Sequence, residues 1–342
     1  MELNLNLKTS SYKIVYGHDI LRTLSSYYDF SNKKVLIVSD DNIPLKYINE
    51  VKKEIVDVYT LILPHGEETK SFPYYLKIND ELIKHNFSRN DCIIALGGGV
   101  IGDLVGLAAS TYKRGIDFIN IPTSTLSMID SSIGGKTAID YKDIKNVIGT
   151  FYQPKLVLID FDTLNSLPIR QVNNGLVEAL KAGFIYDTSI LELFDKDDIY
   201  SHLEEIIIKA INVKKYYVEN DEKEISIRKI LNYGHTFGHA FEALGGFSDS
   251  LYHGEAVGLG MLIVSEDKEK MISYLKKLNI KYDFDIDEDK IIPLILNDKK
   301  VNGEYIDLIV IENNKGVIKK TRLDSLVSYL KGGMKYVRLF RK

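Results

Sequence analysis

The sequence predicts an α/β domain built on a mostly parallel sheet, followed by a mainly α-helical domain. Two observations predict this division. Short apolar runs alternate with amphipathic stretches up to about residue 160, as in strands joined by crossover helices. Beyond Pro168 the apolar residues recur at helical spacing instead. We therefore expect two domains, residues 1–162 and residues 163–342.

Each expected strand is a short apolar run. The expected strands of the sheet are Lys34–Ser39, Val58–Leu63, Asp91–Leu96, Phe118–Ile121 and Lys155–Ile159. Another strand is expected over Met1–Lys8, where three leucines alternate with polar residues. Helices are expected over Leu104–Tyr112, Val172–Ala182, Leu203–Val218 and Lys229–Leu244, because their apolar residues share one helical face.

Composition argues against nucleic acid and membranes as partners. The chain has 342 residues and a net charge of -4, which gives no electrostatic case for either polyanion. No segment has the ~18 uninterrupted apolar residues of a spanning helix, and we expect no signal peptide. The single cysteine, Cys92, cannot form an internal disulfide and fits a reducing compartment. We therefore expect a cytoplasmic protein.

A glycine loop follows one of the expected strands. The spacing Gly97-x-Gly99-x-x-Gly102 matches the dinucleotide fingerprint of Rossmann-like domains, in which the backbone and a helix N-terminus approach a pyrophosphate. The loop lies near residue 100 rather than after the first strand, and no strand ending in an acidic residue follows ~20 residues later. A glycine turn without a ligand remains an alternative. If a nucleotide binds, residues that could hold its ribose are Asp40, Asn42, Glu67 and Lys70.

Histidines gather in the predicted helical domain. His235 and His239 are spaced i and i+4, so they share one face of a helix. His253 follows, and Glu178 lies upstream with Lys181 at i+3. Neutral imidazoles with one carboxylate form a common catalytic zinc set that leaves one position open for substrate. Satisfied core histidines are the alternative, and the spacing leaves open whether His239 is a ligand.

Several cations and hydroxyls could hold an anion. The segment Asp130–Thr137 places Lys136 after a glycine turn, but its first glycine is not at the spacing of a P-loop, which excludes an ATPase loop. Lys136 and nearby hydroxyls could still hold a phosphate. Further candidates, each with an ordinary surface alternative, are Arg114, Lys145, Asn146, Lys181, Lys214, Arg228, Lys299 and Lys300.

Taken together, these motifs resemble those of the 3-dehydroquinate synthase family. The matching segments occur in family order from about residue 39 to residue 300, nearly the whole chain. They are Gly97–Gly106, Arg114-Gly115, Asp130–Thr137, Lys145-Asn146, Glu178–Lys181, Leu231–His239, His253–Val257 and Asp298–Lys300.

The resemblance implies a homodimer whose subunit has a Rossmann-like, NAD-binding α/β domain and a mainly helical, metal-binding domain. It implies that Glu178, His235 and His253 bind Zn²⁺, for which Co²⁺ can substitute, and that His239 is a catalytic histidine outside the ligand set. The residues implied around the substrate are Lys136, Lys145, Asn146, Lys181, Lys214, Arg228, Asn232, Lys300 or its neighbour Lys299, and Arg114. The residues implied at NAD are Asp40, Asn42, Glu67, Lys70, Gly98, Gly99, Asp103, Thr123, Ser124 and Asp130, with Lys136 and Lys145.

The resemblance also implies a reaction. The sugar phosphate 3-deoxy-D-arabino-heptulosonate 7-phosphate is expected to be oxidised transiently, to lose phosphate by β-elimination, to be reduced again, and to close into 3-dehydroquinate by an intramolecular aldol step. This is a carbon–oxygen lyase reaction of the shikimate pathway with no net redox change. The oxidation requires a dinucleotide and a Lewis acid, and the elimination requires cations at the phosphate.

Three other functions remain as alternatives. Another sugar-phosphate cyclase, such as a 2-deoxy-scyllo-inosose synthase or a sedoheptulose 7-phosphate cyclase, would share the NAD and metal sites. Asn232, Lys214 and Arg228 nevertheless favour a carboxylated substrate, because two cations suit a carboxylate. A metal-dependent polyol dehydrogenase would release stoichiometric NADH. A nucleotide-binding regulatory protein without catalysis would not need the intact metal and lysine residues.

Overall fold

The computed structural model describes residues 1–342 except 9, 143, 247–249, 297–300 and 303. Its contacts divide the chain into two compact units, Met1–Pro168 and Ile169–Lys342. The boundary expected after residue 162 falls within the short helix η5 (Phe161–Ser166), which stays with the N-terminal unit. One reason is that the Tyr47 hydroxyl donates a hydrogen bond to the carbonyl of Asp162 at 3.0 Å.

The N-terminal unit contains a seven-stranded sheet in the order β1-β2-β9-β6-β5-β3-β4. Its strands are β1 (Glu2–Asn6), β2 (Ser11–Gly17), β3 (Lys34–Asp40), β4 (Asp57–Leu63), β5 (Cys92–Gly97), β6 (Asp117–Pro122) and β9 (Leu156–Asp160). Neighbouring strands are parallel except for β1 and β2. The predicted mostly parallel sheet is confirmed, as are the expected strands, whose ends shift by one or two residues.

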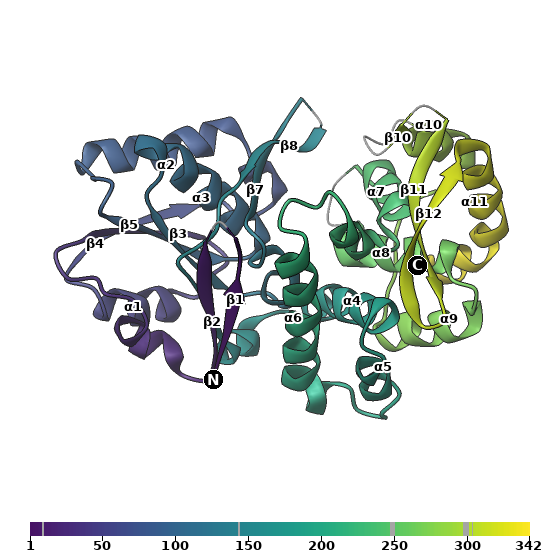
Figure 1. Cartoon of the computed structure of the whole chain (residues 1–342), viewed down its shortest axis with the longest axis horizontal. Helices are drawn as coiled ribbons and strands as arrows, with labels where there is room; N and C mark the ends of the chain where they lie inside the picture. The colour runs from purple at the N-terminus through teal and green to yellow at the C-terminus, as the bar shows by residue number, and fades with distance from the viewer. Residues whose placement is uncertain (9, 143, 247–249, 297–300, 303) are drawn as a thin grey trace. The chain divides into compact units, whose positions relative to one another are not determined.

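Helices cover both faces of this sheet, so its central strands are apolar on both sides. Along β3, Leu36 and Val38 join the core beneath α2 (Phe72–Lys84) and α3 (Gly99–Thr111). Their neighbours Val35 and Ile37 join the opposite core, beneath α1 (Leu45–Lys53). Figure 1 shows α2 and α3 on one face and α1 on the other. The alternation follows from the two-residue period of a strand.

Strand β2 and an antiparallel ribbon are absent from the sequence-based prediction. The ribbon consists of β7 (Lys136–Tyr141) and β8 (Ile144–Phe151). Most residues of β8 are exposed, so the strand lacks the apolar alternation that identifies a half-buried strand. The ribbon follows the glycine turn that precedes Lys136, so this turn leads into a strand and not into the helix of a P-loop.

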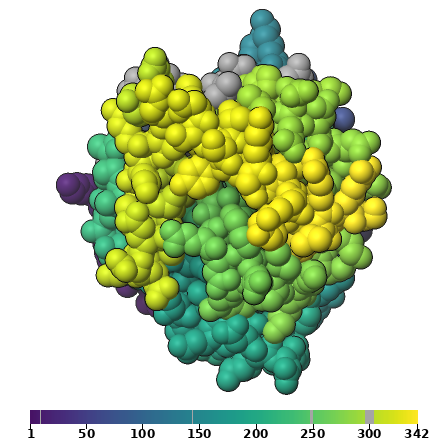
Figure 2. Space-filling view, turned by 90° about the vertical axis from the view of Figure 1, so that its right-hand side faces the viewer, coloured from purple at the N-terminus to yellow at the C-terminus, as the bar shows by residue number. Residues whose placement is uncertain are grey.

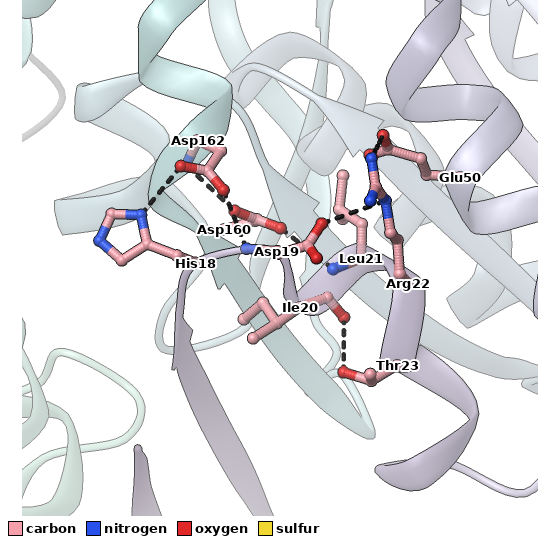
Figure 3. A network of polar contacts seen from close by, with 9 residues as sticks. All are labelled: His18, Asp19, Ile20, Leu21, Arg22, Thr23, Glu50, Asp160 and Asp162. Atoms are coloured by element: carbon pink, nitrogen blue, oxygen red, sulfur yellow. Dashed lines mark hydrogen bonds and ion pairs between the residues drawn. The ribbon is translucent and has the colours of Figure 1, made fainter.

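A polar network joins the ends of β2 and β9 (Figure 3). The carboxylate of Asp160 accepts hydrogen bonds from the backbone N–H groups of Leu21 and Asp162, both at 3.0 Å. Asp162 in turn accepts the N–H of Asp19 at 2.9 Å. These bonds hold the short helix η1 (Ile20–Ser26) against the carboxyl end of β9.

The C-terminal unit is mainly helical, as predicted. Its helices are α4 (Ile169–Ile185), α5 (Ser189–Phe194), α6 (Leu203–Asn220), α7 (His235–Leu244), α8 (His253–Val264), α9 (Lys268–Lys277), α10 (Glu288–Leu296) and α11 (Leu323–Val337). The remaining short helical turns of the chain are η2 (Glu67–Thr69), η3 (Tyr112–Arg114), η4 (Ser127–Ser131), η6 (Tyr200–His202), η7 (Ile227–Asn232) and η8 (Arg338–Phe340). In the described part of the chain, no helix is long and apolar enough to cross a membrane.

A small sheet in this unit was not expected. It consists of β10 (Val301–Asn302), β11 (Tyr305–Glu312) and β12 (Lys315–Arg322). Asn313 and Asn314 join the last two strands with φ of 51° and 59°, the left-handed pair that tight hairpin turns require. This Asn-Asn pair after the apolar run of β11 was the available signal. Figure 2 shows the face of the unit that these strands and α11 cover.

The prediction of one helix over Lys229–Leu244 is wrong at its start. The chain forms the short turn η7, breaks at Tyr233-Gly234, and begins α7 only at His235. Gly234 has a φ of 80°, which glycine adopts without strain. A Cβ atom there would also lie 2.5 Å from Cγ of Met261, so the break brings the backbone against α8.

Glycines let α7 and α8 pack closely. A Cβ atom on Gly260 would lie 2.0 Å from the carbonyl oxygen of Gly234, and a Cβ atom on Gly238 would lie 3.0 Å from Cα of Val257. Backbone atoms cannot yield as a flexible side chain can. The separation of the two helices therefore depends on these glycines.

We predict that Gly260→Ala lowers the free energy of unfolding by about 1–3 kcal/mol, because the added methyl group forces the two helices apart. Gly332→Ala is the matched control, since Gly332 lies on helix α11 with open space where its Cβ would be. It should be neutral or slightly stabilising. Chemical denaturation of both variants checks the prediction, and equal unfolding midpoints would contradict it.

Candidate functional site

Glu178, His235 and His253 meet in the C-terminal unit, with their ligand atoms all within 4.8 Å of one another. The Nε2 atoms of His235 and His253 each lie 3.9 Å from Oε1 of Glu178. Two ligand atoms bonded at ~2.1 Å to a tetrahedral zinc ion are about 3.4 Å apart, and no geometry places them more than about 4.2 Å apart. Both separations fit that limit, and they are too long for direct hydrogen bonds.

Each of these three residues comes from a different helix. Glu178 lies in the middle of α4, whereas His235 and His253 are the first residues of α7 and α8. The close packing of α7 on α8 brings the two histidines together, with ring centroids 5.3 Å apart. The site therefore depends on helix packing more than on any loop.

The contacts of the Glu178 carboxylate indicate whether a metal ion fits between these three residues. Glu178 is 2% exposed, and the Lys181 ammonium lies beside its Oε2 as an ion pair. Nevertheless, the other oxygen, Oε1, accepts no hydrogen bond from the described residues. Buried polar atoms normally have such partners, so Oε1 lacks part of its expected coordination. A divalent cation would supply it, and two imidazoles with one carboxylate suit zinc.

Neighbouring groups orient both imidazoles. Nδ1 of His253 lies 3.3 Å from Oε2 of Glu242, and Nδ1 of His235 lies 3.2 Å from the carbonyl oxygen of Tyr233. A proton on each Nδ1 satisfies both acceptors and leaves each Nε2 lone pair toward Glu178. Sequence reasoning missed Glu242, although it lies seven residues after His235 and therefore on the same face of α7.

His239 lies beside this centre and is exposed. Its ring centroid is 5.3 Å from that of His235 and 6.0 Å from that of His253. His239, Glu242 and His253 also have ligand atoms within 4.8 Å of one another. The exposed His239 ring is therefore accessible to a molecule that binds beside His235 and His253. Its role as a catalytic residue that is not a metal ligand remains a proposal.

Three predicted substrate-binding cations are buried in this unit. Lys181 is 3% exposed, Lys214 7% and Arg228 1%. Buried cations require anionic or strongly polar partners. Arg228 donates to the carbonyl of Glu222 at 2.6 Å, and Lys181 pairs with Glu178. Buried cations of this kind suit an anionic ligand.

Asp221 organises the segment that carries Arg228 and Asn232. Its carboxylate accepts backbone N–H groups from Ile225 at 3.0 Å, Ser226 at 2.7 Å and Arg228 at 3.0 Å. Burial raises the pKa of Asp221, but these backbone hydrogen bonds outweigh it and leave the pKa lower than usual. Sequence reasoning missed Asp221. It also missed Glu224, whose Oε1 accepts a hydrogen bond from the Asn232 side chain at 2.7 Å.

In the N-terminal unit, the predicted nucleotide residues follow the carboxyl ends of adjacent parallel strands. β3 ends at Asp40, β5 ends at Gly97 and β6 ends at Pro122. The structure therefore brings Asp40 and Asn42 to the same edge of the sheet as Gly98, Gly99, Thr123 and Ser124. Ligands of open α/β sheets bind at this edge. Burial raises the pKa of Asp40, whose Oδ1 accepts the N–H of Asn42 at 3.0 Å.

Lys70 connects the glycine-loop helix to the ribbon. Its ammonium lies 2.5 Å from both Oδ2 of Asp103 and Oδ1 of Asn146. Burial lowers the pKa of Lys70, but the carboxylates of Asp103 and Glu67 outweigh it, so the net shift is upward. Asp140, which sequence reasoning missed, accepts the N–H of Asn146 at 2.7 Å and donates its own N–H to the Lys70 carbonyl at 2.8 Å.

The remaining predicted residues are more dispersed. Lys145 lies 3.6 Å from Glu67, and Asp130 is half-buried in η4. Lys136 is the exposed first residue of β7. Arg114 is exposed with a φ of 66°. Lys299 and Lys300 lie outside the described residues.

We predict that Asp221→Asn lowers the free energy of unfolding by about 1–3 kcal/mol at pH 7, because the loop N–H groups lose a charged acceptor. The depressed pKa means that Asp221 stabilises the fold above its unfolded pKa of about 3.9. This contribution disappears as the pH falls through the lower folded pKa, so the difference between variant and wild type should shrink in acid. Urea unfolding of both proteins at pH 7, 5 and 3.5 measures this difference in the free energy of unfolding. The exposed Asp197→Asn is the control, and a difference independent of pH would contradict the prediction.

Family models match both units of the chain. The models of the 3-dehydroquinate synthase N-terminal and C-terminal regions match residues 60–174 and 175–301. A 3-dehydroquinate synthase of Clostridium botulinum (strain Alaska E43 / Type E3) is 39% identical over 346 residues, covering 94% of this chain and 99% of that protein. The 3-dehydroquinate synthase of Dictyoglomus thermophilum is 41% identical over 333 residues, covering 90% of this chain and 91% of that protein.

Solved structures share the fold. A 2-deoxy-scyllo-inosose synthase complexed with carbaglucose-6-phosphate, NAD⁺ and Co²⁺ has a TM-score of 0.85 and 24% identity, covering 97% of this chain and 100% of that chain. The 2-epi-5-epi-valiolone synthase of Streptomyces hygroscopicus with NAD⁺ and Zn²⁺ has a TM-score of 0.83 and 22% identity, covering 96% and 98%. Because the family models span both units and relatives at 39% and 41% identity align along nearly the whole chain, this protein belongs to the 3-dehydroquinate synthase family.

Proposed function

We propose that this chain converts 3-deoxy-D-arabino-heptulosonate 7-phosphate into 3-dehydroquinate and phosphate, with NAD and a divalent metal, preferably zinc, as cofactors. The observation that supports this most is the buried Glu178 carboxylate, which faces two imidazole Nε2 atoms and has the Lys181 ammonium beside it. A metal-dependent oxidation of a hydroxyl requires such a donor set, and an anionic substrate requires such a cation.

Bound NAD would supply the redox chemistry, and a bound metal would supply a Lewis acid. Zinc held by Glu178, His235 and His253 would act as the Lewis acid that acidifies the hydroxyl to be oxidised. NAD would accept and later return one hydride, so no NADH accumulates.

The protein side chains bind and orient the substrate. We assign the buried Lys181, Lys214 and Arg228, with Asn232, to its carboxylate and hydroxyl groups, because burial strengthens their electrostatic attraction. We assign His239, exposed beside the metal ligands, to proton transfer at a substrate hydroxyl.

The phosphate requires its own cations. Once the neighbouring hydroxyl has become a ketone, the adjacent C–H is acidic, and the departing phosphate can accept that proton. We assign Lys136, Asn146 and Arg114 to the phosphate, where the two cations neutralise the charge that develops as the C–O bond breaks and the Asn146 amide donates a hydrogen bond. Lys300, or its neighbour Lys299, is assigned to the substrate by family resemblance.

We further propose that the protein acts in the cytoplasm as a homodimer. The family resemblance supports the dimer, and the exposed Arg114 fits a residue that serves a partner subunit. Light scattering should give about twice the 38.9 kDa mass of one chain. A monomer with full activity would contradict the dimer.

A coupled assay tests the reaction. Purified protein, the heptulosonate phosphate, catalytic NAD and zinc should release phosphate and 3-dehydroquinate in equal amounts without lasting NADH absorbance. Lasting, stoichiometric NADH would favour a polyol dehydrogenase. Turnover only with a hexose 6-phosphate would favour a cyclase like 2-deoxy-scyllo-inosose synthase, whose structure resembles this one.

We predict that Glu178→Gln lowers zinc affinity at least about 100-fold and lowers turnover with it. Losing a residue that only hydrogen-bonds to a metal ligand already lowers metal affinity about 10–100-fold, and losing a ligand itself should cost more. Chelator competition measures the affinity, and atomic absorption gives the zinc content. Glu192→Gln, an exposed change on α5, is the control and should leave both unchanged. Undiminished zinc binding in Glu178→Gln would remove Glu178 from the ligand set.

A further inference from the structure

Helix α4 and the first turn of α8 meet in a regular set of contacts that extends beyond the metal centre. The first contact joins Arg170 to Glu255. Nε of Arg170 donates to Oε1 of Glu255 at 2.7 Å, and Nη2 donates to Oε2 at 2.7 Å. Glu255 is 2% exposed, and the Arg170 guanidinium lies 4.2 Å from the ring centroid of Tyr252. Paired bonds of this kind fix the angle between partners as well as their distance.

Glu255 also caps the helix that carries His253. Its Oε2 accepts the backbone N–H of Tyr252, the residue before His253, at 2.9 Å. A carboxylate at this position satisfies a free N–H group and interacts favourably with the positive end of the helix dipole. The Arg170–Glu255 pair thus connects the start of α4 to the backbone on either side of His253.

The second contact lies one turn further along α4. Oδ1 of the buried Asn174 accepts the backbone N–H of Gly254 at 2.7 Å. A Cβ atom on Gly254 would lie 1.9 Å from the backbone carbonyl oxygen of Asn174. The absence of a side chain at Gly254 therefore lets α8 approach the backbone of α4.

The third contact is the one at the metal centre, between Glu178 and His253. Arg170, Asn174 and Glu178 are spaced by four residues, so they share one face of α4. They contact Glu255, Gly254 and His253 in that order, which are successive residues of α8. A shift of α8 along α4 that displaces His253 from Glu178 must therefore also break the other two contacts.

We propose that Arg170 and Glu255 are positioning residues that fix the register of α8 on α4 and thereby set the distance between His253 Nε2 and Glu178 Oε1 for metal binding. This inference rests on the metal centre of the proposed function. Neither residue is a ligand in it, and both act through the backbone of His253. The Glu255 carboxylate is buried and accepts two hydrogen bonds from Arg170, which makes the pair rigid. A fully exposed pair would be flexible and screened by solvent.

The test compares Co²⁺ binding by the full-length wild type with that of Arg170→Lys and Glu255→Gln. Arg170→Lys keeps the positive charge but loses the paired geometry. Glu255→Gln keeps the shape but removes the charge. The control is Arg338→Lys, in an exposed pair of the same unit in which Arg338 Nη2 lies 2.8 Å from Glu288 Oε1. Affinity is measured by chelator competition, ligand geometry by the visible spectrum of bound Co²⁺, and folding by circular dichroism.

The wild type should bind one Co²⁺ with a visible spectrum that Glu178→Gln abolishes. Arg170→Lys and Glu255→Gln should each bind Co²⁺ about 10–100-fold more weakly, with an altered spectrum, while remaining folded. The double variant should lose little more than either single variant, because both changes remove one interaction. Arg338→Lys should match the wild type.

Two kinds of failure are distinguishable. If the wild type binds no Co²⁺ through Glu178, the metal centre of the proposed function fails first. If the wild type binds Co²⁺ and both single variants keep its affinity and spectrum, the positioning role is wrong even if the variants unfold more easily. Arg170→Met, which removes the charge as well as the paired hydrogen bonds, should bind Co²⁺ no more tightly than Arg170→Lys, and tighter binding by Arg170→Met would contradict the role of the pair.

Discussion

The C-terminal unit depends on the burial of the Glu178 carboxylate between two imidazoles. A carboxylate without water is costly unless cations and hydrogen bonds compensate for it. Here the Lys181 ammonium compensates Oε2, while Oε1 has no hydrogen-bond donor among the described residues. A bound divalent ion would remove this imbalance. The glycines between α7 and α8 and the contacts between α4 and α8 bring Glu178, His235 and His253 together. The metal affinity that we propose would therefore depend on the same helix packing that stabilises this unit.

The N-terminal unit follows a different constraint, the shared direction of its strands. Parallel strands end at one edge, so residues distant in the sequence, such as Asp40, Gly98 and Thr123, come to that edge together. The Lys70 ammonium then joins Asp103 on α3 to Asn146 on the ribbon. A charged group held between two elements fixes the ribbon relative to the helix that follows the glycine loop.

Local patterns allowed much of this to be predicted from sequence. The central strands were recognisable because both of their faces are buried, as Leu36 and Val35 show on opposite sides of β3. The histidines and Glu178 were recognisable because of their chemistry and spacing. By contrast, β8 faces solvent and has no strong periodicity, and Gly234 interrupts a helical pattern that continues across it. Asp221 and Asp140 act on other residues through loop contacts, which no spacing in the sequence reveals. The spacing of Glu242 places it on the His235 face of α7, but it does not reveal the contact with His253 on another helix.

The most direct test of the account is an anomalous diffraction measurement at the zinc absorption edge on crystals of the zinc-loaded protein. The account predicts one strong peak bonded to Glu178, His235 and His253 at about 2.0–2.2 Å, with a further coordination position left for substrate or water. A peak bonded to His239 and Glu242 in place of Glu178 and His235 would contradict it, because these residues form the competing cluster around His253. Zinc-loaded crystals with no peak near Glu178 would contradict it as well.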